Sequence, residues 1–388
     1  MTNYTHEQVA SLINAQRKNI FGTDENIVAP DLSNIADVNK SFTDETRIKL
    51  INNMLVNGLR IMIEDKKIKL PFPEFFKSQD EWNAFIAQYN IVMPELIDST
   101  HINKVSGVDF SAMEHTFIAP EVKAQYWDEP ERTFMVTYCI DNVRVDLEKL
   151  FNKPEEITAW ISAQHSAAEK AVITGMSIFF RDTIASLAGK LMKAGKYRKF
   201  LNEYNELHES ETGFTPLYKS NCWSDMNFVG YLLEQINLIK ESFTTTSTEN
   251  NVAEYEQLTL EDEFYLMLIT DVEQKIKAYY NPMVRNDGRT IETLPDHKTT
   301  YFWMVNKRDF DVRSKMAVVI DNETVEMNNV LGLAFDFNAV AIHNERVIST
   351  QAPTASGNFT KFFNSILLKG IINTTQNACL LLLGDDPE

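Results

Sequence analysis

Alternating hydrophobic and polar positions predict a β ribbon near the end of the chain. Residues 333–353, LAFDFNAVAIHNERVISTQAP, alternate, are interrupted by a charged stretch, alternate again and end at a proline. A period of two is typical of a strand with one buried face. The pattern therefore predicts one strand, a charged turn and a second strand that returns beside it.

A single long helix is predicted over residues 155–194. Apolar side chains recur at helical spacing from Ile157 to Leu191 without a break. A proline and two acidic residues open the stretch, and lysines with Gly195 close it, as is usual at helix ends. At 1.5 Å per residue the helix would measure roughly 60 Å. We expect the terminal ribbon to bury its apolar side and Gly175 to mark a kink.

The segment from Lys66 to Arg132 is punctuated by prolines and carries many aromatic residues. Proline excludes long helices and central strands, so we expect an extended excursion. Exposed aromatic side chains are costly, and these should therefore meet another surface, either the body of the chain or a neighbouring molecule. The aromatic residues concerned are Phe72, Phe75, Phe76, Phe117, Tyr126 and Trp127.

The remaining patterns predict a mixture of helices and strands. Residues 1–42 hold only short apolar patches and are expected to form either an extended arm or a mobile terminus, whereas residues 43–65 have a helical stripe. The other predicted elements are strands at 134–147, 264–270 and 316–320, the last two buried, a helix at 228–239, and a capping box of Thr270 and Glu273. The predicted fold class is α+β.

The composition is that of a globular, acidic chain. Hydrophobic residues make up 44% of the 388 positions, enough for a sizeable core, and the formal net charge is −18. Such a chain does not attract the phosphate backbone of nucleic acid, because that attraction depends on Lys and Arg. It can still enclose nucleic acid without binding it tightly.

Cysteine usage and the N-terminus favour a protein made and used in the cytoplasm, or released from it by lysis. Cys139, Cys222 and Cys379 are odd in number and far apart, which favours reduced core thiols over disulfides. The N-terminus lacks the pattern of a signal peptide. No apolar run approaches the length that spans a membrane, so no membrane partner is expected.

No sequence motif indicates a catalytic, cofactor-binding or metal-binding residue. Glycine-rich phosphate loops and the nucleophile elbow of hydrolases are absent from the sequence. The seven histidines have no ligand spacing, and His165 is expected on the polar side of the long helix. Asp385 and Asp386 are interpreted as a solvated acidic tail rather than a cation site. We therefore expect no catalysis, no cofactor and no metal.

The order of the predicted elements resembles that of the major capsid proteins of tailed bacteriophages, which have the Hong Kong 97 fold. The residues from 333 to 353 look like the penultimate ribbon of that family, and FYLMLIT and MAVVID look like strands of its axial domain. NACLLLLGDD resembles its closing strand. FMVTYCIDNVRVDLEKLFNKPEEITAWISAQ is similar to the run into the spine helix of small podoviruses of the phi-twenty-nine type.

The resemblance implies a division of the chain and a structural role. Its implied segments are an N-terminal arm (1–42), a helix leading into an extended loop (43–65), the loop itself (66–132), a peripheral domain with the spine helix (133–200), an axial domain (201–332), and a return to the peripheral domain with the closing strand (333–388). The Lys and Asn that crosslink subunits in the founding member of the family are not identified in this sequence, and we do not expect the extra immunoglobulin-like domain that some relatives carry.

The implied function is self-assembly through pentamers and hexamers into an icosahedral shell around double-stranded DNA. The implied partners are other copies of the chain, a portal protein and a scaffolding protein, with assembly in the bacterial cytoplasm and a final place in the virion capsid. Two alternatives stay open. One is a non-viral compartment shell of the encapsulin type, and the other is an α/β enzyme whose long loop closes over an active site.

Overall fold

The computed structural model divides the chain into two compact units. Unit 1 combines Met1–Trp82, Pro130–Phe180 and Ile342–Gly370, and unit 2 combines Asn83–Glu129, Arg181–Ala341 and Ile371–Glu388. The structure describes residues 5–21, 27–40, 42–43, 47, 50, 72–77, 87–91, 122–126, 131–141, 153–281, 294–300, 314–320, 322–353 and 359–387. Most of the helix predicted at 43–65 and much of the predicted excursion lie outside these residues.

Unit 1 contains a four-stranded sheet with the order β1-β11-β12-β4. Its strands are β1 (Phe76–Lys77), β4 (Glu131–Asp141), β11 (Val340–Pro353) and β12 (Phe359–Ile372). β12 pairs antiparallel with β4 from Phe359 opposite Asp141 to Lys369 opposite Glu131, and β1 joins β11 in parallel. The strand predicted at 134–147 is confirmed as far as Asp141.

The N-terminal residues of unit 1 are helical rather than extended. They form α1 (His6–Phe21) and the short α2 (Ile35–Asn39). The Asn14 amide holds the segment between them by accepting from the N–H of Val28 and donating to its carbonyl, both at 2.8 Å. Ile13 on α1 is completely buried. The prediction of an extended arm is therefore wrong for α1, because buried apolar contacts and side-chain hydrogen bonds support a helix whose stripe looks weak in isolation.

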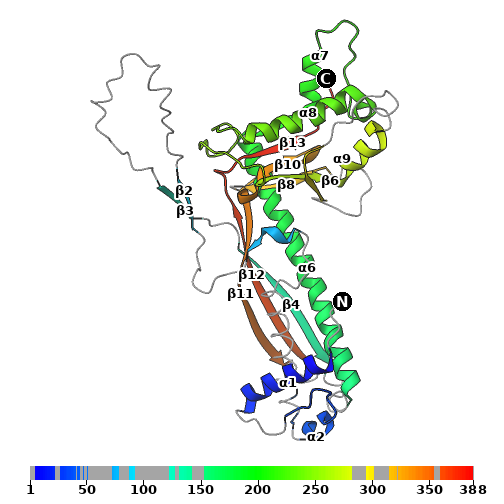
Figure 1. The fold of residues 1–388 in the computed structure, drawn as a ribbon, viewed down its shortest axis with the longest axis vertical. Coiled ribbons are helices and arrows are strands. Elements are labelled where there is room, and N and C mark those ends of the chain that lie inside the picture. Colours follow the sequence, from blue (N-terminus) through cyan, green and yellow to red (C-terminus); the bar gives the residue numbers. More distant parts are fainter. Residues whose placement is uncertain are drawn as a thin grey trace, which may run out of the picture. The chain divides into compact units, whose positions relative to one another are not determined.

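The long helix is confirmed as α6 (Pro154–Lys193), a continuous helix of 40 residues that belongs partly to each unit (Figure 1). It ends two residues before Gly195, whose φ of +72° lies in the left-handed region that favours glycine. The amide of Lys196 donates to the carbonyl of Leu191 at 2.9 Å, as expected for such an ending. The kink expected near Gly175 stays a prediction.

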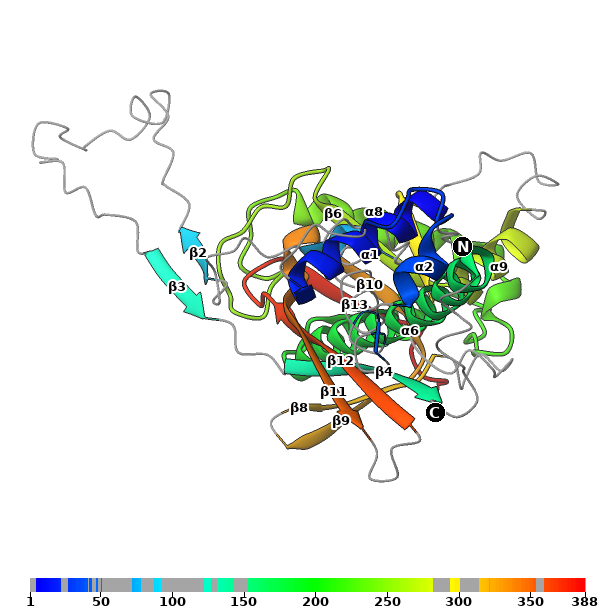
Figure 2. The ribbon, with the colours of Figure 1, turned by 90° about the horizontal axis from the view of Figure 1, so that it is seen from below.

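Within unit 1, aromatic residues from the predicted excursion pack on α6. The ring centroid of Phe180 lies 5.0 Å from that of Phe72, 5.3 Å from that of Phe75 and 6.3 Å from that of Phe76. These three residues therefore meet the body of the chain, one of the two surfaces expected for them. Figures 1 and 2 both show the sheet of unit 1 alongside the first part of α6.

By length and composition alone, α6 could cross a membrane, contrary to the prediction that no apolar run approaches that length. However, 56% of the most apolar 18-residue stretch of this helix is buried within the protein. Its buried side chains include Ile184, Leu187 and Leu191. A helix whose apolar side is covered by its own chain has the character of a core helix.

Unit 2 is built on a five-stranded sheet with the order β5-β13-β10-β6-β7. Its strands are β5 (Tyr197–Lys199), β6 (Phe264–Ile269), β7 (His297–Thr300), β10 (Val330–Asp336) and β13 (Ala378–Leu382). β10 is buried along its whole length between β6 and β13, antiparallel to both. The buried strand predicted at 264–270 and the predicted closing strand are thus confirmed as β6 and β13.

The helices of unit 2 follow the predicted periodicity with one exception. They are α7 (Phe200–His208), η2 (Cys222–Ser224), α8 (Met226–Phe243), α9 (Thr270–Lys275) and the π-helix η3 (Ile276–Tyr280). α8 confirms the helix predicted at 228–239, and Phe243 at its end packs edge-on against Phe264 of β6 at 5.8 Å between ring centroids. The capping box is wrong, since Thr270 is already helical and its neighbour Ile269 occupies the N-cap position without a side-chain hydrogen bond.

The predicted ribbon at 333–353 is the main correction. The turn is formed by η4 (Phe337–Ala339), which is neutral, and the charged stretch around Glu345 lies inside β11. β10 and β11 do not form a ribbon with each other, because β10 belongs to the five-stranded sheet and β11 to the four-stranded one. The strands that lie beside β11 are β1 and β12.

The strand predicted at 316–320 is also corrected. It forms β8 (Met316–Ile320), whose one strand partner among the described residues is β9 (Glu323–Met327), with which it makes a hairpin. Val319 is 66% exposed, so only one face of the hairpin is covered. The hairpin lies so close to α6 that a Cβ atom at Gly189 would overlap Val318 and lie 2.5 Å from Ile320 Cδ1. Gly189 therefore permits this approach.

Inside the predicted excursion, two short strands pair with each other. β2 (Ala87–Ile91) and β3 (Val122–Tyr126) are antiparallel, with Ala87 opposite Tyr126 and Ile91 opposite Val122. The two strands are separated by 30 residues of sequence that fall outside the described part. The excursion thus contains a pair of antiparallel strands, which the proline pattern did not predict.

Candidate functional site

The described part of the chain offers no cluster suited to metal chemistry. Among these residues, no group of three or more His, Cys, Asp or Glu side chains could hold a metal ion. Burial raises the pKa of both the Cys222 and the Cys379 thiol to about 12. Both thiols are therefore protonated at neutral pH, and a protonated thiol is a poor nucleophile.

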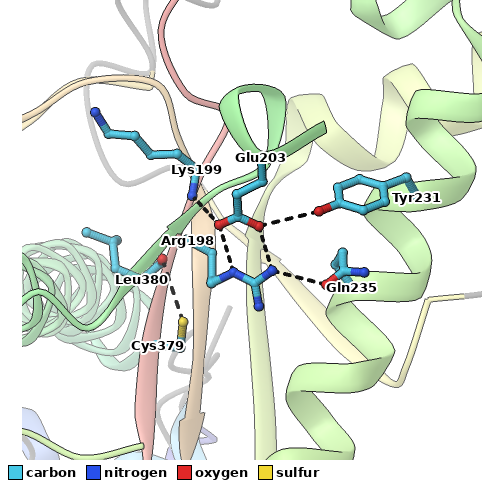
Figure 3. A network of polar contacts seen from close by, with 7 residues as sticks. All are labelled: Arg198, Lys199, Glu203, Tyr231, Gln235, Cys379 and Leu380. Carbon is cyan, nitrogen blue, oxygen red and sulfur yellow. Dashed lines mark hydrogen bonds and ion pairs between the residues drawn. The ribbon is translucent and has the colours of Figure 1, made fainter. Parts of the chain in front are cut away.

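A partly buried ion pair joins three elements of unit 2 (Figure 3). Arg198 at β5 donates from Nε to Glu203 Oε1 at 2.7 Å and from Nη2 to Glu203 Oε2 at 2.5 Å, so the pair is bidentate. Arg198 Nη2 also donates to Gln235 Oε1 of α8 at 3.0 Å, and Tyr231 Oη lies 3.5 Å from Glu203 Oε2. The hydrogen bonds that Arg198 donates to Glu203 raise the pKa of Arg198, which keeps the guanidinium charged.

We expect Glu203→Ala to destabilise unit 2 by about 1.5–3 kcal/mol, because it leaves the Arg198 guanidinium without its carboxylate partner. The matched double variant Arg198→Met with Glu203→Ala should recover much of this loss, since it removes the unpaired charge as well. Urea denaturation of the purified chain measures both changes. Equal stability of the single variant and the parent chain would contradict the expectation.

The acidic residues near the C-terminus are anchored rather than free. Asp385 Oδ2 lies 2.8 Å from Lys199 Nζ, and the amide of Asp385 donates to Asn202 Oδ1 at 2.8 Å. Asp386 Oδ1 accepts from the amide of Lys219 at 2.7 Å. The prediction of a solvated tail is therefore wrong in part: the side chains remain half-exposed, but they fasten the end of the chain to the start of α7 and to the loop after it. Nothing in these contacts resembles a cation site.

Several large apolar side chains of unit 2 are exposed and are candidates for contact with another molecule. The segment after α8 shows the clearest pattern, because Glu254, Glu256, Leu258 and Leu260 face solvent while Thr259 is buried. This face is both acidic and apolar. Scattered exposed apolar residues are normal on a monomer, so the face is a candidate interaction surface and no more.

Comparison with known proteins gives structural neighbours but no sequence relatives. No protein-family model matches the sequence, and no curated protein matches it. A chain from the capsid structure of Staphylococcus phage Andhra is similar, with a TM-score of 0.45 and 10% identity over 81% of this chain and 84% of that one. A chain from the capsid of cyanophage P-SCSP1u has a TM-score of 0.42 and 10% identity, covering 80% and 86%. A chain from the capsid of a native GTA particle has a TM-score of 0.40 and 9% identity, covering 83% and 90%.

These three neighbours all come from capsids, and each is matched over most of its length. With TM-scores below 0.5 and identities of 9–10%, the similarities alone assign neither a fold family nor a function.

Proposed function

We propose that this chain is the major capsid protein of a tailed bacteriophage, with a fold of the Hong Kong 97 type. The observation that carries the proposal is the order of elements along the chain. The chain runs through a paired excursion (β2 and β3), a strand (β4), a 40-residue helix (α6), a mixed unit, two 14-residue strands (β11 and β12) and the closing strand β13. The sequence resemblance implies this order.

The chemistry of the described residues supports a structural role over a catalytic one. The two thiols described above are protonated, the partly buried ion pair of Arg198 and Glu203 links structural elements, and the acidic residues near the C-terminus fasten the chain to itself. Each of these groups makes contacts that serve the fold.

Further partners follow from the proposed role. Copies of the chain would assemble as pentamers and hexamers in the host bacterial cytoplasm, with a portal protein at one vertex and a scaffolding protein during assembly. The net charge of −18 suits a container for DNA, because an acidic wall does not retain the genome that must later leave. The division into arm, extended loop, peripheral domain and axial domain is part of this proposal.

We expect assembly to be steep in protein concentration and to strengthen with salt. A subunit in a closed lattice makes several contacts at once, so weak contacts reinforce one another. Acidic subunits repel each other, and salt shortens the Debye length from about 10 Å at 0.1 M to about 3 Å at 1 M. Light scattering and negative-stain electron microscopy across both variables measure the effect, with and without the phage's scaffolding protein.

Closed particles, or pentamers and hexamers, are the expected result. A protein that remains a monomer or dimer at every salt and protein concentration and binds a small ligand stoichiometrically would overturn the proposal in favour of an enzyme. Shells that contain a protein cargo, together with a host gene outside any phage genome, would instead indicate a compartment of the encapsulin type.

A further inference from the structure

Two turns of unit 2 that are close in space but distant in sequence are tied to each other. The first comprises residues 336–339, between β10 and β11, and the second comprises residues 373–377, between β12 and β13. The amide of Asp336 donates to the carbonyl of Asn377 at 2.8 Å, and the amide of Asn373 donates to the carbonyl of Ala339 at 2.8 Å. β11 therefore starts, and β12 ends, at a pair of mutually bonded turns.

A third segment, residues 250–263, holds both turns. The amide of Phe337 donates to the carbonyl of Glu263 at 2.7 Å, and the amide of Ala378 donates to the carbonyl of Asn250 at 2.8 Å. The amide of Ala253 donates to the carbonyl of Thr374 at 3.1 Å. Three pieces of chain thus meet through backbone hydrogen bonds.

At the centre of this junction lies a buried chain of polar side chains. Asp336, Thr259 and Asn377 are each 0–1% exposed. Asn377 Nδ2 donates to Thr259 Oγ1 at 3.1 Å, and the Thr259 hydroxyl is hydrogen-bonded to Asp336, whose Oδ1 also accepts from the amide of Asn338 at 2.8 Å. No donor among the described residues reaches the buried Asn377 Oδ1. The cluster contains one acid and an unmatched acceptor, and no cation.

We infer that Asp336 is a proton-operated latch that fastens the turns 336–339 and 373–377 to each other. The carboxyl group is buried beside neutral partners, so its ionised form is the costly one. A proton on Asp336 removes the buried charge and adds a donor to a cluster that is short of donors. Loss of the proton weakens the junction from which β11 starts and at which β12 ends.

The charged surroundings of Asp336 also favour its protonated form. Burial raises the pKa of Asp336, and the negative charge of Glu263 raises it further, while the hydrogen bonds from Asn338 and Thr259 oppose this. Glu263 is the charged group that faces Asp336 from the 250–263 segment. The facing residues of the other elements, Phe264 of β6, Phe243 of α8 and the Asn and Thr residues of the 373–377 turn, are uncharged.

The direction of the pH effect follows from linkage. Below the ordinary value of 3.8, Asp336 is protonated in both the closed and the opened junction, and the latch is fully effective. As the pH rises above 3.8, the opened form loses its proton first, so the closed form loses relative stability until the pH passes the raised pKa of Asp336. The closed junction is therefore most stable in acid and becomes less stable as the pH rises toward neutrality.

The test is amide hydrogen exchange on the full chain from pH 4 to pH 8, corrected for intrinsic rates, in the parent and in Asp336→Asn. The reporters are the amides of Asn373 and Ala378, and the amide of Leu201, bonded to Leu383, is the reference within unit 2. In the parent, protection at the reporters should fall about tenfold for each unit by which the pKa of Asp336 exceeds 3.8. Asp336→Asn keeps an acceptor and has no proton to lose, so its protection should not depend on pH.

A second variant keeps the inference testable if Asp336→Asn folds poorly. Glu263→Gln retains the side-chain acceptor for Asn338 but removes the facing charge, so the fall in protection should move to lower pH. An unchanged pH profile in Glu263→Gln, or a parent profile that Asp336→Asn reproduces, would overturn the latch. The inference does not rest on the proposed capsid function, since every readout comes from the dissolved subunit.

Discussion

Replacement of Gly332 by alanine is expected to prevent stable folding of unit 2. Gly332 lies in β10, at the centre of the five-stranded sheet. A Cβ atom there would overlap the carbonyl oxygen of Met267 and lie 2.9 Å from Leu268 Cα. Both are backbone atoms of the neighbouring strand, so the clash cannot be relieved by a side-chain rotation. We expect a cost of about 3 kcal/mol or more, a large share of the stability of an ordinary domain.

Gly230→Ala is the matched control for this prediction. Gly230 lies within α8, and a Cβ atom there would meet only Tyr280 Oη, at an ordinary contact distance of 3.8 Å. Alanine in a helix interior is favoured over glycine, so this variant should be more stable by about 0.5–1 kcal/mol. Thermal melting followed by far-UV circular dichroism compares both variants with the parent. Parallel changes in the two variants would contradict the role assigned to Gly332.

Removal of the segment between β2 and β3 is expected to abolish shell formation and spare the fold. In this variant residues 93–120 are replaced by a short Gly-Ser turn, so that the paired strands keep their register. A flexible replacement costs little loop-closure free energy, and the buried core of both units lies elsewhere among the described residues. The far-UV helical signal should therefore persist, while closed particles disappear from electron micrographs.

A Gly-Ser replacement of the same length as residues 93–120 separates the effect of sequence from that of length. If the excursion contacts neighbouring subunits through its own side chains, this control should also fail to form shells. Particles of normal size from either variant would show that assembly does not depend on the excursion. Loss of the helical signal would show instead that the segment belongs to a folding core.

The sequence predicted α6 and the strands β6 and β13 well, because their burial is encoded locally. The stripe from Ile157 to Leu191 needs no knowledge of its partners, and β6 and β13 read as apolar runs between polar segments. The same reasoning gave a wrong prediction for β8, which was expected to be buried. Its apolar run pairs with a single strand, so Val319 remains exposed, and no local pattern distinguishes a central strand from one side of a hairpin.

The sequence pattern does not indicate the turn at 337–339, because the charged stretch around Glu345 interrupts the alternation more visibly than the neutral residues that form the turn. The structure instead turns where Asp336 accepts the amide of Asn338, which is an Asx-type turn. Periodicity could not show that the strands on either side join different sheets, since pairing is decided by partners far along the chain. The burial of Asp336 was equally hidden, because its environment is built by Thr259 and Asn377, which lie far from it in sequence.

The place of β13 in its sheet has a consequence for how the protein is made. β13 lies between β5 and β10, yet it is among the last elements of the chain to be synthesised. About 180 residues separate it from β5, and at ribosomal rates of about 5–20 residues per second they take roughly 10–40 s to appear. β5 lacks this neighbour throughout that interval, and β10 lacks it from its own synthesis until β13 appears. A nascent chain, or one truncated before Ala378, therefore cannot complete the five-stranded sheet. Only fully translated copies have the completed unit 2 with which to associate.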